Sequence, residues 1–419
     1  MKIKVKKLSY NQVASLPQEK PVSPKRTSRF FRWLMKTASA SELRKTNFRC
    51  EKIGMEKLGK KEPCLILMNH SSFIDLKIAA TVLYPRAFNI VMTSDGFVGK
   101  RSFMRSLGCI PTNKFVTDTA LVRKMTACLK KLKTSVLLYP EASYSFDGTA
   151  TPIPYGLSKC VKILGVPVVF IKTDGAFLRD PLYNNLQQRQ VNVSATMEYL
   201  FSPDQIEEAS ADEIYAVLKE RFAFDNFRYQ QQHGITVGEP FRADGLERVL
   251  YKCPHCMAEG VTEGKGIKLT CGNCGADYVL NENGYLVAQN VESKFNHIPD
   301  WYAWERECVK RQIDGGEYKL DIDVDVYVMK GYKAVYDVGA GKLTHDKSGF
   351  QLTLNDGSLN YFQPAKLSYS VYADYFWYEI GDVICIGNND YLYYCFPKNV
   401  KGVVAKTRLA AEEIFKGLQ

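Results

Sequence analysis

The sequence predicts an α/β domain with a mainly parallel sheet, then a small module organised by cysteines, then a mostly antiparallel β domain with a C-terminal helix. Strand-like and helix-like stretches alternate from residue 47 to about 240, two Cys-x-x-Cys pairs follow, and short alternating stretches begin at residue 317. Strands that alternate with helices are typical of parallel sheets, whereas consecutive strands pair antiparallel. The expected segments are 1–46, 47–245, 250–290 and 297–419.

Length and composition favour several folded domains and an anionic partner. The chain has 419 residues, 46% of them hydrophobic, and a net charge of +11. Such a charge suggests a phospholipid surface, a nucleic acid or a phosphorylated ligand. No apolar run approaches the roughly 20 residues needed to span a bilayer, and no signal-peptide core follows the basic start. We therefore expect a cytoplasmic protein, peripheral on the cytoplasmic face of a membrane.

The first segment combines a basic arm with an amphipathic helix. Residues 1–28 are polar, basic and interrupted by prolines, which predicts an irregular arm. Residues 29–44 are helix-prone and carry large apolar side chains between cations, namely Phe30, Phe31, Trp33 and Leu34 with Arg29, Arg32 and Lys36. This composition is typical of a helix lying in a membrane interface. The alternative is a domain helix that packs these side chains inward.

The α/β segment places polar turns at the ends of buried strands. The expected strands are 47–53, 64–68, 88–92, 135–139, 166–171 and 191–199. The expected helices are 73–83, 100–107, 117–132, 156–164 and 211–228. Ligand sites in such sheets lie at the carboxyl ends of strands. His70 follows one of these strands, and Glu141 follows another, where an unpartnered charge is unfavourable.

Residues 63–80 predict a strand, a tight turn and a helix, with His70 in the turn. His70 and Asp75 can meet only if His70 precedes the helix, because a five-residue spacing on one helix would point them apart. A carboxylate bonded to one imidazole nitrogen fixes the tautomer and leaves the other nitrogen as a base. The alternative is a capping box from Ser72 to Asp75, in which Asp75 satisfies a backbone donor.

Residues 60–175 resemble the glycerolphosphate/lysophospholipid acyltransferase (PlsC-like) family. The family motif N-H-x-x-x-x-D matches Asn69, His70 and Asp75. The second motif matches residues 108–114 loosely, with Lys114 in place of Arg. The third, F-P-E-G-T-R, aligns with residues 139–144, where Ala142 and Tyr144 replace Gly and Arg, and the fourth matches residues 165–170.

The resemblance implies an O-acyltransferase that moves a fatty acyl group from acyl-CoA or acyl carrier protein to a lysophospholipid hydroxyl, as in 1-acylglycerol-3-phosphate. His70 is then the general base, oriented by Asp75. The implied substrate-binding residues are Asn69, Gly108, Lys114, Glu141 and Ser143. The family's third-motif Arg is thought to grip the acceptor phosphate, so Tyr144 leaves another lysophospholipid or hydroxyl acceptor open. The alternative is a non-catalytic lipid- or protein-binding adaptor on an acyltransferase scaffold.

Four cysteines predict a structural zinc ribbon in residues 250–290. Cys253 and Cys256 form one pair, and Cys271 and Cys274 form the second; 14 residues lie between the pairs, and a hairpin follows. Each Cys-x-x-Cys turn presents two thiolates, as tetrahedral Zn²⁺ requires. His255 lies inside the first turn and is not expected to be a ligand. The remaining cysteines are scattered, as buried thiols in a reducing compartment are.

The last segment predicts a helix over residues 297–311, anchored by Trp301 and Trp304, then about seven short strands with turns that include Gly331 and Gly341. A final helix over residues 400–418 closes the chain. This pattern resembles the pleckstrin-homology/GRAM-like barrel, which implies docking to a lipid headgroup or a protein; the alternative is an unrelated β-sandwich. The ribbon is also a candidate for protein docking. Nucleic-acid binding is not expected, because no basic patch with interleaved aromatics lies near the ribbon.

Overall fold

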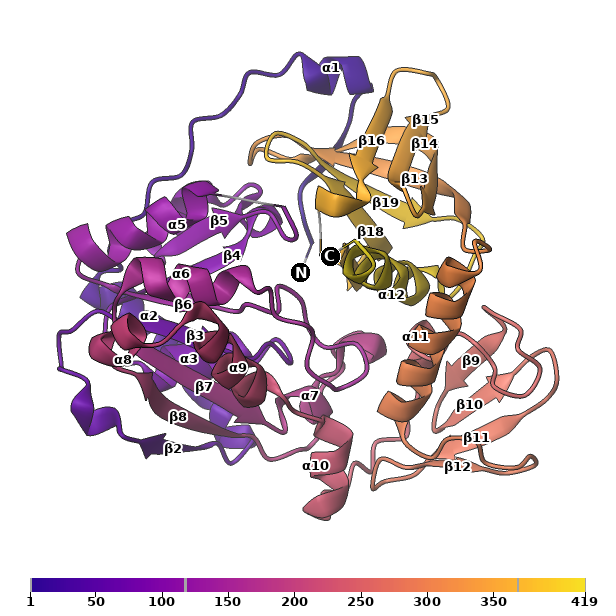
Figure 1. Cartoon of the computed structure of the whole chain (residues 1–419), viewed down its shortest axis with the longest axis horizontal. Helices are drawn as coiled ribbons and strands as arrows, with labels where there is room; N and C mark the ends of the chain where they lie inside the picture. Colours follow the sequence, from indigo (N-terminus) through magenta and orange to yellow (C-terminus); the bar gives the residue numbers. More distant parts are fainter. Residues whose placement is uncertain (1, 117–118, 368, 419) are drawn as a thin grey trace.

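The computed structural model describes residues 2–116, 119–367 and 369–418 and arranges them in three packed units (Figure 1). The α/β domain lies on one side, and the cysteine module and the C-terminal β domain lie on the other. One buried hydrophobic cluster contains Phe146 of the α/β domain, Tyr278 of the cysteine module and Leu352 of the β domain. The three units are therefore joined through a shared core.

The α/β domain is built on a seven-stranded sheet with the order β2-β8-β7-β3-β6-β4-β5. Every neighbouring pair is parallel except β7 and β8. The strands are β2 (Arg49–Ile53), β3 (Leu65–Met68), β4 (Phe88–Thr93), β5 (Cys109–Thr112), β6 (Ser135–Leu138), β7 (Val168–Asp174) and β8 (Ser194–Phe201). The predicted mainly parallel sheet is thus confirmed.

Helices cover both faces of this sheet, because its central strands are apolar on both sides. In β3, Ile66 and Met68 join one buried cluster, and Leu65 and Leu67 join the other. Successive side chains of a strand point to opposite faces, which explains why this strand is an unbroken apolar run. The helices are α2 (Arg29–Lys45), α3 (Asp75–Val82), α4 (Arg101–Ser106), α5 (Thr119–Thr126), α6 (Gly156–Leu164), α7 (Ala176–Arg179), α8 (Pro203–Glu208), α9 (Ala211–Phe222) and α10 (Asn226–Gln232).

Two predictions about this domain are corrected. No strand was predicted over residues 109–112, but β5 pairs with β4 at the edge of the sheet, where Pro111 is tolerated. The single helix expected over residues 211–228 is two helices, because Asp225 begins α10 by accepting the backbone N–H of Arg228. The expected helix over residues 117–132 has its first two residues outside the described part of the chain, and it ends in a π-helical turn, Ala127–Lys131.

The N-terminal arm is mostly irregular, as predicted, but it contains one short strand and one short helix that the sequence did not predict. β1 (Val5–Lys7) pairs in parallel with β14 of the C-terminal β domain, and α1 (Tyr10–Ala14) follows with a capping box at Ser9. The arm then crosses to the α/β domain, where the Thr27 hydroxyl donates to the carbonyl of Phe88 at 3.1 Å. The segment therefore links the two domains. In α2, Phe30, Trp33 and Leu34 are exposed and not packed inward.

The cysteine module is a four-stranded antiparallel sheet with the order β12-β11-β10-β9. Its strands are β9 (Thr262–Lys265), β10 (Lys268–Cys271), β11 (Asp277–Leu280) and β12 (Leu286–Ala288). It packs on α11 (Ile298–Asp314), where Trp301 contacts Tyr278 with ring centroids 5.1 Å apart.

The C-terminal β domain is an antiparallel sheet with the order β16-β15-β14-β13-β19-β18-β17, and it carries a final helix, α12 (Val403–Lys416). Its strands are β13 (Leu320–Met329), β14 (Val335–Asp346), β15 (Gly349–Leu354), β16 (Asn360–Pro364), β17 (Tyr372–Trp377), β18 (Gly381–Gly387) and β19 (Leu392–Pro397). The turn predicted at Gly341 is wrong, because β14 runs through it. A Cβ there would lie 2.3 Å from the carbonyl oxygen of Thr353 in β15, so this position needs glycine for strand pairing.

The C-terminal β domain packs against the carboxyl edge of the α/β sheet. Asp95, after β4, accepts hydrogen bonds from Tyr372 Oη at 3.1 Å and Trp377 Nε1 at 3.0 Å. Phe146, after β6, contacts Tyr375 with ring centroids 4.5 Å apart. The edge that holds the polar turns is thus covered by a second domain. Within the described residues, no helix combines the length and apolar character needed to cross a bilayer.

Candidate active site

The candidate site lies where β3, β6 and β7 end side by side. β3 pairs with both other strands in parallel, so the loops that follow them emerge at one edge. His70 lies in the loop after β3, Glu141 in the loop after β6, and Thr173 near the end of β7. The sequence predicted the first two of these positions.

His70 and Asp75 contact each other directly. His70 Nδ1 lies 3.2 Å from Asp75 Oδ2, and this oxygen also accepts the backbone N–H of Ser71 at 2.8 Å and of Ser72 at 3.0 Å. Asp75 is the first residue of α3, and His70 precedes the helix, as the five-residue spacing requires. With its proton on Nδ1, His70 donates to Asp75 and keeps the Nε2 lone pair free.

The capping interpretation is also partly correct. Asp75 reaches back to the N–H of Ser72, but the Ser72 hydroxyl gives the helix no side-chain cap. One carboxylate therefore both orders the turn and holds the imidazole. The same bonds occupy the backbone donors of Ser71 and Ser72.

Asn69 holds the turn that contains His70 through hydrogen bonds to Ser71 and to β7. Its side chain is fully buried, donates to Ser71 Oγ at 3.0 Å and to the Thr173 carbonyl at 3.3 Å, and accepts the Thr173 N–H at 2.8 Å. The Thr173 hydroxyl in turn lies 3.5 Å from Asp75 Oδ1. Asn69 therefore positions the turn, because both the nitrogen and the oxygen of its side-chain amide are already hydrogen-bonded within the chain.

Glu141 ties the two loops together. Its Oε2 accepts the backbone N–H of His70 at 2.7 Å, and its Oε1 accepts both the N–H and the hydroxyl of Thr151 at 3.0 Å. Burial raises the pKa of Glu141 to about 7, although these backbone donors act in the opposite direction. Both carboxylate oxygens are thus bonded within the chain, and the geometry gives Glu141 a positioning part as well.

Two tyrosines contact the imidazole ring. The centroid of His70 lies 4.1 Å from that of Tyr139, in a stacked arrangement, and 4.3 Å from that of Tyr144. These rings leave 21% of the His70 side chain exposed. Tyr144 stands where the family motif has Arg, so this position supplies a ring to the site in place of a cation. Sequence reasoning missed both contacts, because neither tyrosine belongs to a pattern that predicts stacking.

Lys114 lies close to this group and under the C-terminal β domain. Its Nζ is 4.1 Å from the centroid of the Tyr372 ring in β17. Burial lowers the pKa of His70, the carboxylate of Asp75 opposes this shift, and the positive charge of Lys114 lowers the pKa further. A neutral imidazole is the form that can act as a base.

The two remaining predicted residues are placed differently. Ser143 is buried in the loop after β6, and its Oγ has no hydrogen-bond partner among the described residues. Gly108 lies at the amino end of β5, the edge of the sheet opposite His70, with φ of +84°. A Cβ there would lie 2.2 Å from the Thr27 hydroxyl, so Gly108 admits the N-terminal arm. Gly108 therefore does not lie beside His70, and its part in substrate binding stays a prediction.

The four cysteines of the module converge as a metal site requires. The sulfurs of Cys253, Cys256, Cys271 and Cys274 all lie within 4.8 Å of one another, and two of the pairs are 3.7 Å apart. A tetrahedral Zn²⁺ with bonds of about 2.3 Å separates its sulfur ligands by about 3.8 Å, so the donor set fits zinc. His255 bonds to Tyr278 Oη at 2.8 Å and is not part of the cluster.

Comparison with known proteins agrees with the resemblance. A family model described as acyltransferase matches residues 49–172. A solved structure, the 1-acyl-sn-glycerophosphate (LPA) acyltransferase PlsC from Thermotoga maritima, is 14% identical over 46% of this chain and 78% of that chain, with a TM-score of 0.34. No curated protein matches the sequence.

Residues 49–172 are thus a domain of the acyltransferase family, as the motifs predicted. The matched region contains His70, Asp75, Lys114 and Glu141, and it ends before the cysteine module and the C-terminal β domain.

Proposed function

We propose that this protein is an O-acyltransferase that moves a fatty acyl group from a thioester, acyl-CoA or acyl carrier protein, to the hydroxyl of a lysophospholipid such as 1-acylglycerol-3-phosphate. The observation that carries the proposal is the contact of His70 Nδ1 with Asp75 at 3.2 Å, which leaves Nε2 free beside a partly exposed edge of the site.

In this reaction, His70 Nε2 takes the proton of the acceptor hydroxyl as its oxygen attacks the thioester carbonyl. The carbon–sulfur bond then breaks, and the thiolate takes the proton from the imidazolium. The Asp75 carboxylate stabilises the positive charge that the ring carries between these steps. No covalent acyl-enzyme is required.

The other predicted residues have supporting parts in the proposal. Asn69 and Glu141 hold the backbone and side chains of the His70 turn, and they act on the substrate through that turn. Ser143 and Lys114 are the proposed substrate contacts, Ser143 because its buried hydroxyl is unpartnered and Lys114 because its ammonium lies near His70. Zn²⁺, held by the four cysteines, stabilises the small module and takes no part in the chemistry.

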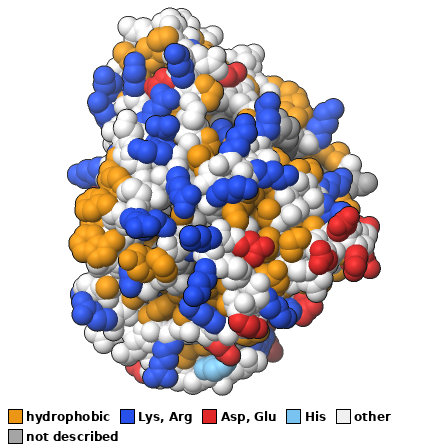
Figure 2. Space-filling view, turned by 90° about the vertical axis from the view of Figure 1, so that its left-hand side faces the viewer, with side chains coloured by type: hydrophobic (Ala, Val, Ile, Leu, Met, Phe, Trp, Pro, Cys, Tyr) orange, Lys and Arg blue, Asp and Glu red, His pale blue; other side chains and the backbone are white. Residues whose placement is uncertain are grey.

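The protein is proposed to work at a membrane, on its cytoplasmic face. Phe30, Trp33 and Leu34 of α2 and Phe103 of α4 are exposed, and Phe31 links the two helices by a ring contact at 6.4 Å to Phe103. We call these four exposed residues the aromatic surface. Figure 2 shows this side of the α/β domain, where hydrophobic side chains gather among many lysine and arginine side chains. Such a mixture favours an anionic lipid surface.

The segments 1–46, 47–245, 250–290 and 297–419 stand as proposed domain limits, with the N-terminal arm shared between two of them. The C-terminal β domain, with seven antiparallel strands and a final helix, supports the pleckstrin-homology/GRAM-like likeness as a proposal. This domain packs against the carboxyl edge of the α/β sheet. Docking of a lipid headgroup or of a protein is proposed as a further role of the same domain.

The test is acyl transfer by the full chain and by a His70→Ala variant, with acyl-CoA and acyl carrier protein as donors and a panel of lysophospholipids as acceptors. Loss of the base lowers kcat by about 10²–10⁴-fold. His233→Ala, at an exposed histidine at the end of α10, is the matched control and keeps full activity. A folded wild type that binds lysolipid but turns over no thioester refutes catalysis and favours the adaptor alternative.

A further inference from the structure

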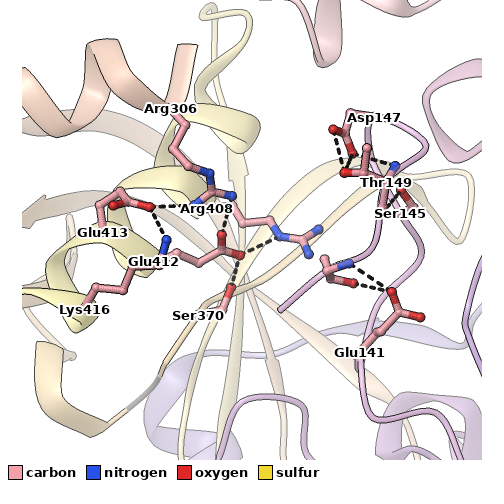
Figure 3. Close-up of polar contacts among 11 residues, drawn as sticks. Glu141, Ser145, Asp147, Thr149, Arg306, Ser370, Arg408, Glu412, Glu413 and Lys416 are labelled. Atoms are coloured by element: carbon pink, nitrogen blue, oxygen red, sulfur yellow. Dashed lines mark hydrogen bonds and ion pairs between the residues drawn. The ribbon is translucent and has the colours of Figure 1, made fainter. Parts of the chain in front are cut away.

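A buried arginine of the C-terminal helix faces the candidate active site without a complete set of partners. Arg408 of α12 is 3% exposed, and its Nη1 has no hydrogen-bond partner among the described residues. Its guanidinium lies over the Phe146 ring, with Cζ 4.4 Å from the centroid. Figure 3 shows this side chain reaching from α12 toward the loop that carries Glu141, Ser145 and Thr149.

The charges around Arg408 do not balance. Glu412 accepts hydrogen bonds from Arg306 at 2.7 Å and from Arg408 Nε at 3.2 Å. Glu413 is bonded to Arg306 at 2.9 Å and to Lys416 at 2.6 Å. Two carboxylates therefore meet three cations, and the donor left without a partner is the end of Arg408 that faces the α/β domain.

The acidic residues of the facing loop do not complete the balance. The oxygens of Glu141 are bonded to His70 and Thr151, and Asp147 accepts the N–H and hydroxyl of Thr149 at 3.1 and 2.9 Å. Neither carboxylate is bonded to Arg408. Arg408 shares the carboxylate of Glu412 with Arg306, and its buried Nη1 is bonded to neither of these loop carboxylates. An incompletely paired buried cation is unfavourable, so this position is suited to an anion that arrives with a ligand.

Lys114 places a second cation near the same point. Its charge lowers the pKa of His70. Burial lowers the pKa of Lys114 itself, the carboxylates of Asp374 and Asp95 oppose this shift, and the charge of Arg408 lowers the pKa further. The imidazole thus has one cation near it from each side of the domain interface, and Asp374 and Asp95 lie on the Lys114 side. Guanidinium and ammonium groups together are typical of phosphate binding, the guanidinium as a fork and the ammonium as a point charge.

We propose that Arg408 and Lys114 bind the phosphate group of a substrate beside His70, so that the C-terminal β domain completes the substrate site of the acyltransferase domain. This inference rests on the proposed function for its reaction. The phosphate belongs either to the lysophospholipid acceptor or to the CoA of the donor. Because Tyr144 brings no cation to the loop after β6, Arg408 supplies the charge from a different domain.

The kinetic test uses the full chain with Arg408→Met, which removes the charge, and Arg408→Lys, which keeps the charge but not the fork. Lys347→Met is the matched control, since it removes an exposed cation from the turn between β14 and β15 of the same domain, outside this charge network. The measured quantity is the ratio of kcat/KM for 1-acylglycerol-3-phosphate to that for 1-acylglycerol, a ratio that does not depend on the folded fraction. A second arm compares acyl-CoA with an acyl-N-acetylcysteamine thioester, which carries no phosphate.

We expect Arg408→Met to lower one of the two ratios about ten- to hundredfold, because a hydrogen bond to a charged group is lost. The ratio for Arg408→Lys is expected to fall between those of the wild type and Arg408→Met, and the ratio for Lys347→Met is expected to match the wild type. A fall in the first ratio assigns the phosphate to the acceptor, and a fall in the second assigns it to the donor. Two unchanged ratios overturn the proposal.

Binding separates this inference from the proposed function. Glycerol 3-phosphate and coenzyme A are titrated calorimetrically into wild type and Arg408→Met. Binding of either probe that weakens about ten- to hundredfold in the variant supports the phosphate site, even if no acyl transfer is found. A wild type that binds neither probe, or a variant that binds both as well as the wild type, overturns it.

Discussion

Replacement of Asp75 by Asn tests whether this carboxylate acts through His70 or only caps a helix. Asp75 Oδ2 bonds to His70 Nδ1 and to two backbone N–H groups, of Ser71 and Ser72. Hydrogen bonds to a charged acceptor contribute about 1.5–3 kcal/mol and neutral ones about 0.5–1.5. Two weakened backbone bonds therefore lower the free energy of unfolding by about 2–3 kcal/mol. Loss of charge beside the imidazolium lowers kcat by about 10²–10⁴-fold.

A double-mutant cycle separates the two roles. Acyl transfer is measured for Asp75→Asn, His70→Ala and the double variant, and unfolding is followed by urea denaturation. If Asp75 acts through His70, the double variant is no slower than His70→Ala, because the two effects are not additive. A double variant slowed by the product of the two single effects would refute the dyad and leave Asp75 as a cap.

Three further predictions concern separate parts of the chain. Lys114→Met removes a cation that lowers the pKa of His70, so the acidic limb of the pH profile of kcat/KM moves to higher pH; a limb that stays or moves lower contradicts the placement of Lys114. Mass spectrometry of the native protein is expected to find one zinc ion per chain, and a chain without metal refutes the ribbon. Removal of the zinc by a chelator is expected to expose the buried Trp301 beside Tyr278 and to shift its fluorescence to longer wavelength. The double substitution Phe30→Ser and Trp33→Ser is expected to weaken the free energy of binding to anionic vesicles, measured by sedimentation, by roughly 2 kcal/mol per ring. Phe362→Ser, at an exposed residue of β16, is the control. A double variant that binds as well as this control contradicts the aromatic surface.

The His70 turn could be predicted because its geometry is local. Asp75 is the fifth residue after His70, and the strand, turn and helix around them follow from short-range patterns. The cysteine cluster was predictable for a similar reason, since two Cys-x-x-Cys turns constrain four sulfurs. The roles of Asn69 and Glu141 were less accessible, because their partners Thr173 and Thr151 lie 104 and 10 residues away.

Longer-range pairing accounts for the errors at the sheet edges. β5 carries Pro111, which argues against a strand unless the strand lies at an edge, and only the sheet order places it there. β1 is three residues long, and its partner β14 begins more than 300 residues later, so no local pattern signals the pairing. Gly341 was expected to end a strand, whereas the closeness of β15 is what requires glycine there.

By itself, the sequence determined the acyltransferase motifs, the mainly parallel sheet, the four cysteines that converge and the direction in which His70 and Asp75 approach each other. Each of these depends on neighbours within a few residues or on a fixed ligand spacing. Only the tertiary structure decided that the rings of Tyr139 and Tyr144 contact His70, that Gly108 lies at the opposite edge, and that Arg408 of another domain packs on Phe146 in the loop after β6. The first two depend on how distant segments pack within the α/β domain, and the third depends on how the C-terminal β domain packs against the carboxyl edge of the sheet. Packing between distant segments leaves no periodic signal in either segment.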